Sequence, residues 1–144
     1  MLKKNKSLGR SFGSIVTWHR GGGVKRNFRP IYNYRNNTEV YAIIRSIEYD
    51  PNRSAFIGLV QSQSGAFFNI IISSNMKVGE VICLTKDNIS FNKIGDFLKL
   101  RYAPIGVPIY NLEKSPGSGP VFSRAAGVHS ILLTKDLKYG KVRL

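Results

Sequence analysis

The sequence is poor in the residues on which most enzymes and disulfide-bonded proteins depend. Among 144 residues there is one cysteine, Cys83, which excludes an internal disulfide framework and a cysteine-rich zinc site. Two histidines and eight carboxylates leave few groups for acid–base or metal chemistry. The longest apolar run, around residues 69–72, has the length of a strand and not the roughly 20 residues of a membrane-spanning helix. We therefore expect no catalytic residue, metal, cofactor, small-molecule substrate or membrane contact.

Positive charge is what the chain has in excess. Its 22 Lys and Arg residues against eight Asp and Glu give a formal net charge of +14, and a hydrophobic content of 42% is enough for a core. Such an excess in a small protein is typical of polyanion binders, most often of proteins that bind nucleic acid.

The charge is concentrated in residues 1–38, which hold nine basic residues and no acidic one. We predict that this segment is an extended basic N-terminal arm without a core or a fixed shape of its own. Its cations alternate with aromatic residues such as Trp18, which can stack on bases. The run Gly21-Gly22-Gly23 allows a close approach to phosphates. A solvated basic tail is the alternative interpretation.

From Glu39 onward the sequence has the pattern that is typical of β-strands. Short β-branched or aromatic segments alternate with turn residues, and no window has the apolar period of a helix. The pattern predicts an all-β protein with one small barrel at 39–95 and a second at 96–144. It predicts a loop at 114–120 and at most one helical turn at 90–94. The expected strands are residues 40–47, 55–60, 66–72, 80–84, 97–102, 108–112, 120–122, 129–133 and 139–144.

A few isolated residues could carry chemistry, but each has a simpler interpretation. His19 lies between Trp18 and Arg20, which favours a phosphate or base contact over catalysis. His129 is expected to be partly buried, and Cys83 to be an inert core thiol. The pair Glu48 and Asp50 suggests turn capping and a salt bridge to Arg53, with an enzyme site as the remote alternative.

Three segments carry a family resemblance, in this order and spacing. They are Trp-His-Arg-Gly-Gly-Gly-Val-Lys-Arg with Phe28-Arg29, Glu-Tyr-Asp-Pro-Asn-Arg-Ser-Ala at 48–55, and residues 105–127, which end in Ser-Arg-Ala-Ala-Gly. Together they resemble the RNA-binding part of the universal large-subunit ribosomal protein L-two (L2) family, over roughly residues 9–144.

The resemblance implies an OB-type barrel followed by an SH3-like barrel, and binding to large-subunit rRNA. It also implies support for rRNA assembly, the peptidyl-transferase region and subunit association in translation, beside neighbouring ribosomal proteins. It places RNA contacts at Arg53 and Arg124, for which ion pairs to Asp50 and Glu113 are the structural alternatives. With the arm and nearby loops, the predicted RNA-binding residues are Trp18, His19, Arg20, Gly21, Gly22, Gly23, Lys25, Arg26, Arg29, Asn52, Arg53, Lys114 and Arg124.

The chain also departs from the family. Full-length members have an N-terminal extension and a long Gly- and His-rich tail after the strand that here ends at Leu144, and Val24 stands where the family usually has a histidine. We expect a fragment or a split protein whose C-terminal half is a separate polypeptide. The abundance of Asn, Ile, Lys, Phe and Tyr indicates an AT-rich coding genome. Together with the missing tail, this predicts a mitochondrially encoded protein of the matrix and its mitoribosome, with a plastid or the bacterial cytoplasm as the alternative.

A competing hypothesis is a free-standing OB-type protein that binds single-stranded RNA or DNA, or an RNA chaperone. It requires an exposed aromatic row on one barrel face, built from Tyr41, Phe56, Phe67 and Phe68. Their place in apolar strands predicts that most of the four belong to the core instead.

Overall fold

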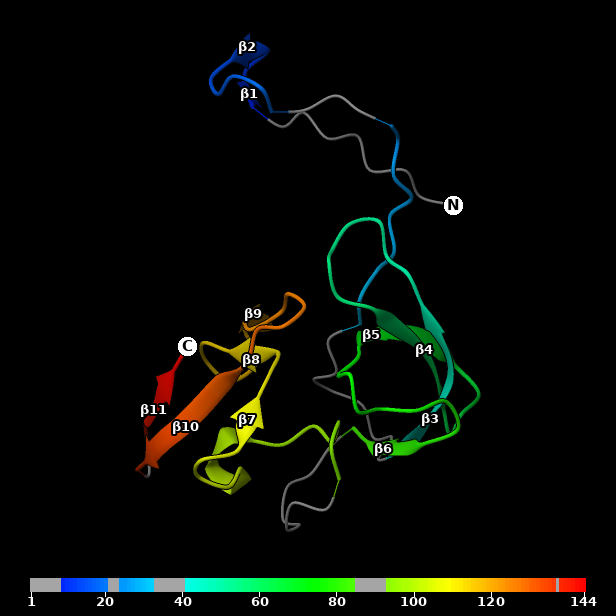
Figure 1. Ribbon diagram of the computed structural model, residues 1–144, viewed down its shortest axis with the longest axis vertical. Coiled ribbons are helices and arrows are strands. Elements are labelled where there is room, and N and C mark those ends of the chain that lie inside the picture. Colours follow the sequence, from blue (N-terminus) through cyan, green and yellow to red (C-terminus); the bar gives the residue numbers. More distant parts are fainter. Residues whose placement is uncertain (1–8, 21–23, 33–40, 85–92, 137) are drawn as a thin grey trace.

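The computed structural model describes residues 9–20, 24–32, 41–84, 93–136 and 138–144, and Figure 1 shows them as strands joined by turns. These residues contain no α-helix, so the all-β prediction is confirmed. No helix among them is long and apolar enough to cross a membrane. The elements are β1 (Arg10–Ser11), β2 (Ser14–Ile15), β3 (Tyr41–Glu48), β4 (Ile57–Ser62), β5 (Phe67–Ile71), β6 (Val81–Cys83), the 3-10 helix η1 (Leu100–Tyr102), β7 (Pro108–Ile109), β8 (Leu112–Glu113), β9 (Pro120–Phe122), β10 (Ser130–Lys135) and β11 (Gly140–Arg143).

A four-stranded antiparallel sheet forms the first folded unit, in the order β5-β4-β3-β6. Its strands are segments where the sequence concentrates β-branched and aromatic residues, which fit a pleated, half-buried surface. Because successive side chains of a strand point to opposite faces, one face of the sheet can be wholly apolar. That inner face packs the core, which consists of Ala42, Ile44, Val60, Ile70, Met76, Ile82 and Leu84.

The outer face of the same sheet carries a cross-strand row that runs over all four strands. Ile43 pairs with Val81 on β6 and with Gln61 on β4, and Gln61 pairs with Phe67 on β5. Phe67 and Val81 are exposed. This part of the outer face therefore remains open to solvent.

A second outer row lies further along the sheet, where Glu48 pairs with Ile57 and Ile57 pairs with Ile71. A β-bulge between Ile44 and Ser46 adds one residue to β3, so that Glu48 turns to this face. Ile57 and Ile71 are buried although they point away from the inner core. Their burial requires a cover on the outer face, and Arg29 of the N-terminal arm reaches Glu48 of this row.

The C-terminal unit consists of a three-stranded sheet, β11-β10-β7, and the hairpin β8-β9. Leu132 and Ser130 of β10 are fully buried at its centre. His129, expected to be partly buried, is exposed, because Ser130 next to it takes the inward position. That expectation was wrong.

Two predicted strands of this unit are also wrong. Residues 97–102 do not form a strand: η1 closes with local bonds from the N–H of Tyr102 to the carbonyl of Lys99 and from that of Ala103 to Leu100. Pro104 follows, and a proline neither donates to a strand ladder nor lets one continue easily. The predicted strand 108–112 is split into β7 and β8, because Asn111 has a φ of +59°.

The two units share contacts near the end of β6. The N–H of Cys83 donates to Asp96 Oδ1 at 2.9 Å, and the N–H of Phe97 donates to the Cys83 carbonyl at 2.9 Å. The hydroxyl of Tyr110 lies 3.6 Å from Met76 Sδ in the inner core. The Cys83 side chain is buried and forms no disulfide, as predicted for a core cysteine. The helical turn predicted at 90–94 falls mostly outside the described residues.

Candidate nucleic-acid interface

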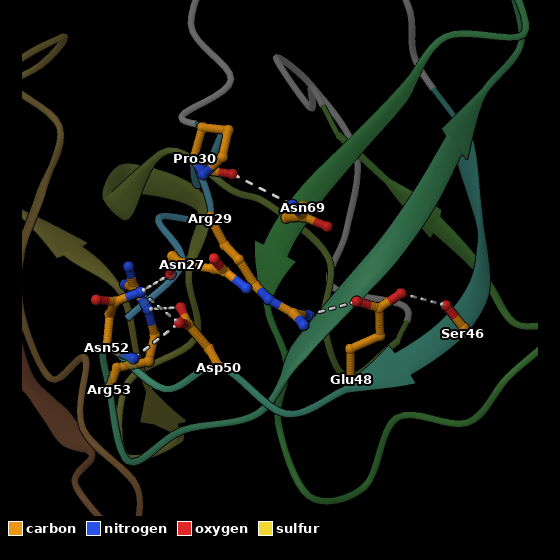
Figure 2. Close-up of polar contacts among 9 residues, drawn as sticks. All are labelled: Asn27, Arg29, Pro30, Ser46, Glu48, Asp50, Asn52, Arg53 and Asn69. Carbon is orange, nitrogen blue, oxygen red and sulfur yellow. Dashed lines mark hydrogen bonds and ion pairs between the residues drawn. The ribbon is translucent and has the colours of Figure 1, made fainter. Parts of the chain in front are cut away.

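Residues 26–32 of the arm lie against the first sheet as a strap, shown in Figure 2. Ile31 forms a parallel bridge with Asn69 of β5, and the N–H of Tyr32 donates to the Asn69 carbonyl at 2.8 Å. The Tyr32 ring packs at 5.4 Å, centroid to centroid, on Phe68. The strap thus adds backbone pairing to the β5 edge, and this part of the arm is not an independent tail.

Arg29 extends across the outer face from β5 towards β3 (Figure 2). Its Nη1 pairs with Glu48 Oε2 at 2.5 Å, and Glu48 Oε1 accepts a bond from the Ser46 hydroxyl at 3.2 Å. Glu48 belongs to the same cross-strand row as the buried Ile57. The strap therefore reaches the second outer row, and Arg29, predicted to contact RNA, has a protein partner on the first sheet.

The turn at 50–53 is organised around one buried carboxylate (Figure 2). Asp50 is 0% exposed, and its Oδ1 accepts bonds from the backbone N–H and the side-chain amide of Asn52, at 2.9 and 3.0 Å. Its Oδ2 accepts a bond from Arg53 Nε at 2.6 Å. Pro51 presets the backbone for such a turn. The sequence interpretation of turn capping with a salt bridge to Arg53 is confirmed.

These bonds also set the protonation of Asp50. Burial disfavours the charged form, but the bonds from the Asn52 backbone, the Arg53 guanidinium and the Asn52 amide together outweigh it, and the pKa of Asp50 lies below its ordinary value of 3.8. The carboxylate is therefore ionised at neutral pH. Arg53 uses Nε in this pair, so the ion pair does not involve its two terminal nitrogens.

The same turn holds the arm. The side-chain amide of Asn52 donates to the Asn27 carbonyl at 2.6 Å, and Arg26 Nη1 donates to the Pro51 carbonyl at 3.1 Å. Asn52 and Arg26 were predicted as RNA contacts, and both connect the arm to the turn that follows β3. The two motifs around residues 18–29 and 48–55 are thus joined in space.

One hydrogen bond connects the third motif, residues 105–127, to the segment that follows the turn at residues 50–53. The backbone N–H of Ala126 donates to the Ser54 hydroxyl at 3.2 Å, across 72 residues of sequence. Ser54 follows Arg53, and Ala126 lies two residues after Arg124. The structure therefore brings together the two arginine loops that sequence analysis identified separately, and it connects them to the arm.

Arg124 is exposed and follows a tightly constrained backbone. Ser123 has a φ of +51° and Asn111 a φ of +59°, and the N–H of Asn111 donates to the Ser123 carbonyl at 3.0 Å. Among the described residues, Arg124 forms no ion pair with Glu113, so that structural alternative is wrong. The Glu113 carboxylate instead accepts bonds from the N–H groups of Gly117 and Gly119 and orders the 114–120 loop. Lys114 lies exposed at the start of this loop.

The tip of the arm carries the remaining predicted contacts. β1 and β2 form a small hairpin, and after it Trp18, His19 and Arg20 are exposed, with Trp18 74% exposed and His19 at a φ of +59°. Lys25 is exposed as well. Gly21, Gly22 and Gly23 lie outside the described residues. An exposed indole beside cations can stack on a base while the cations pair with phosphates.

The aromatic side chains of the first sheet do not form one row. Tyr41, Phe56 and Phe67 are 42%, 58% and 59% exposed, so their predicted place in the core was wrong, whereas Phe68 packs on the core as expected. By strand alternation Tyr41 and Phe67 share the outer face, and Phe56 lies on the other side. The exposure of Tyr41 and Phe67 was not predicted, because their strands are as hydrophobic in sequence as strands that are buried on both faces.

Sequence reasoning also missed Ser54 and Glu48 as parts of this region. Ser54 stands inside the second motif, but its link to Ala126 depends on a tertiary contact that no local pattern signals. Glu48 was seen as a turn residue, and its pairing with Arg29 depends on the bulge that turns it outwards.

Comparison with known proteins finds a matching protein family and similar proteins in bacteria. Residues 1–84 match the family described as "Ribosomal Proteins L2, RNA binding N-terminal domain". The large ribosomal subunit protein uL2 of Rickettsia bellii (strain OSU 85-389) is 42% identical over 132 residues, which cover 92% of this chain and 48% of that protein. That of Orientia tsutsugamushi (strain Ikeda) is 40% identical over 139 residues, 96% of this chain and 50% of the relative. The chain spans about half the length of the curated relatives it matches.

Proposed function

The chain belongs to the ribosomal protein L2 family by its RNA-binding N-terminal domain, and from this premise we propose that it is a structural constituent of the large ribosomal subunit that binds large-subunit rRNA. Membership in a ribosomal protein family agrees with the prediction that the chain is not an enzyme. The observation that carries the proposal is the contact between Ser54 and Ala126, which joins the Arg53 turn, the Arg124 loop and the docked arm into one basic surface.

The proposed mechanism is electrostatic scaffolding. The exposed tip of the arm neutralises phosphates and stacks Trp18 on a base, while Arg53, Arg124 and Lys114 contact irregular or single-stranded rRNA, because the major groove of A-form RNA is too narrow to read. The glycines Gly21, Gly22 and Gly23 complete this set by allowing the backbone close to the RNA. Bidentate pairing and stacking favour arginine over lysine at the two loops.

The finer assignments follow from the family. We propose that the first sheet belongs to an OB-type barrel in 39–95 and the C-terminal unit to an SH3-like barrel in 96–144. In the ribosome, the chain would support rRNA assembly, the peptidyl-transferase region and subunit association, beside neighbouring ribosomal proteins. We further propose a mitochondrial, split form whose C-terminal half is a separate polypeptide. Mass spectrometry of purified ribosomes for a second L2-family chain tests this part.

The second candidate is a free-standing binder of single-stranded nucleic acid, which the exposure of Tyr41 and Phe67 on the outer face favours. Against it, Phe56 lies on the other side of the sheet, and Phe68 packs on the core. The two functions differ in which substitution weakens RNA binding. A Phe67→Ala variant tests the free-standing binder, and Arg124→Ala tests the ribosomal scaffold.

The deciding experiment is sucrose-gradient fractionation of the native source at low and then high salt, probed for this chain. Salt-resistant co-migration with the large subunit is the expected result. Migration at the top of the gradient would overturn the ribosomal function. With the isolated chain and an rRNA fragment, neutralising about eight phosphates predicts a slope of log affinity on log salt of roughly −6 to −7.

A further inference from the structure

An open basic cleft lies in the C-terminal unit, away from the contact between Ser54 and Ala126. It has a volume of about 690 Å³ and is formed where the end of β10 meets η1. Its lining residues are Arg101, Lys135, Asp136, Lys138 and Tyr139. The family motifs include none of them.

Local hydrogen bonds hold the walls of this cleft. Lys135 Nζ donates to the carbonyls of Arg101 and Ala103, both at 2.9 Å, and so ties the end of β10 to η1. The N–H of Asp136 donates to the Tyr139 carbonyl at 2.8 Å and closes the turn that leads to β11. Lys135 thus links the end of β10 to the backbone of Arg101, and the Asp136 bond places Tyr139 next to that end.

The cleft combines an exposed aromatic ring with exposed charged groups. Tyr139 is 79% exposed, so its ring contributes little to the core, and Arg101 and Lys138 are exposed cations that line the same cleft. A flat ring in a cleft that is also lined by cations can stack on a base while the cations pair with the adjoining phosphates. Asp136 adds a carboxylate, which repels an acidic peptide but can accept a hydrogen bond from a base N–H.

We propose that this cleft is a second RNA-binding site that holds one single-stranded nucleotide, stacked on Tyr139 and paired through its phosphates with Arg101 and Lys138. The proposal rests on the proposed RNA-binding function and extends it. Arg124 precedes β10 in the chain, and the cleft begins at Lys135, the last residue of this strand. A six-residue strand is about 20 Å long, which separates the two sites. Figure 1 shows β10 as the long strand of the C-terminal unit. The chain would thereby bridge two separate segments of RNA.

The test uses the full chain and a radiolabelled ten-nucleotide uridine RNA, with ultraviolet cross-linking followed by peptide mapping and with binding titrations. Cross-linking at Tyr139 is expected in the wild type, and Tyr139→Ala should weaken the contact at this site about fivefold to a hundredfold, the range for loss of one stacked base. Tyr139→Phe keeps the ring and should bind as the wild type does. Arg101→Gln should weaken the same contact, while the charge-matched Lys93→Gln, an exposed residue of neither site, should not.

The outcomes separate this proposal from the function on which it rests. If the wild type binds the RNA and Arg124→Ala weakens it, but Tyr139→Ala equals Lys93→Gln, the cleft is not an RNA site. If the wild type binds no RNA, both proposals fail together. If a glutamate oligomer displaces the labelled RNA from the cleft as well as unlabelled RNA does, the cleft binds acidic peptides, and the proposal is also overturned. Because Tyr139 is exposed, all variants should keep the wild-type melting temperature.

Discussion

Asp50 and Arg53 form an ion pair in which Arg53 Nε lies 2.6 Å from Asp50 Oδ2, with the carboxylate side chain 0% and the arginine side chain 20% exposed. In a chain of net charge +14, one of only eight acidic residues is thus fully buried. Its carboxylate stabilises the turn at residues 50–53 and does not contribute to the charge of the surface. An arginine predicted to contact RNA is therefore also part of the protein's own structure.

The first prediction concerns the Asp50→Asn substitution. Because the variant loses the charged acceptor of three hydrogen bonds, the free energy of unfolding should fall by about 1.5–3 kcal/mol, the range for one charge-assisted bond. Urea unfolding at pH 7 measures this difference. A loss below about 0.5 kcal/mol would mean that the turn does not depend on the carboxylate.

The same pair has a defined pH dependence. The folded-state pKa of Asp50 lies below 3.8, so the carboxylate stabilises the fold above that value, and this contribution is lost as the pH falls through the folded-state pKa. The stability difference between wild type and Asp50→Asn should shrink as the pH falls from 5 to 2. A difference that stays constant over this range would contradict the lowered pKa.

The second prediction separates the two arginines. Arg124 is exposed and has no ion pair to Glu113, so Arg124→Ala should weaken rRNA binding with the melting temperature unchanged. Arg53 is bound to Asp50, so Arg53→Ala should weaken rRNA binding and also lower the free energy of unfolding by more than 1 kcal/mol. Paired binding and unfolding measurements on both variants test this, with Lys77→Ala, an exposed residue outside both loops, as the control. Equal stability of the two variants would show that the Arg53 pair contributes little.

The third prediction concerns alkaline pH. Burial raises the pKa of Tyr110 to about 12 from its ordinary 10.0, so the folded state holds this proton more tightly than the unfolded state. The contribution of Tyr110 to stability is complete below pH 10 and is lost as the pH rises towards 12. Tyr110→Phe should remove this part of the pH dependence between pH 10 and 12, as measured by urea unfolding. Identical profiles for the two proteins would show that Tyr110 ionises as an exposed tyrosine does.

The fourth prediction concerns a glycine in the middle of β4. A Cβ atom at Gly58 would clash with Cδ1 of Ile72 and lie 2.7 Å from its Cγ1. Gly58→Ala should therefore destabilise the protein by about 1–3 kcal/mol through overpacking. Ile72→Val removes the closer atom, so it should cost less in the Gly58→Ala background than alone, in a double-mutant cycle. Additive effects would mean that the sheet shifts to accommodate the methyl group.

Much of the fold could be predicted from local patterns. β3, β4 and β5 are rich in branched and aromatic residues and are bounded by turn residues, so their existence and approximate limits were correct. η1 was missed because Phe97–Tyr102 has the composition of a strand, and only its local hydrogen bonds distinguish it from one. The bulge in β3 was not predicted either, although the alternation of apolar and polar residues breaks there, where Arg45 and Ser46 stand side by side.

The site could be predicted in its parts but not in its arrangement. The turn around Asp50 follows from the chemistry of Asp-Pro-Asn, which acts over three residues. The docking of the arm on Asn69 and the contact of Ser54 with Ala126 join residues 38 and 72 positions apart, and their geometry depends on the whole sheet. Tyr41 and Phe67 were misplaced because a two-sided apolar strand does not reveal which face is covered.

The anchoring of Asn27 by Asn52 makes the arm a tethered ligand with a limited reach. The N–H of Val16 donates to the Gly9 carbonyl and closes the hairpin at the tip, so the eleven peptide units from Val16 to Asn27 let the hairpin lie at most about 40 Å from its anchor. Once the loops at Arg53 and Arg124 are bound, the tip searches only this volume, and its binding becomes an intramolecular event with a millimolar effective concentration. Weak contacts at Trp18 and Arg20 can then be occupied almost fully, although the isolated arm would bind the same RNA poorly.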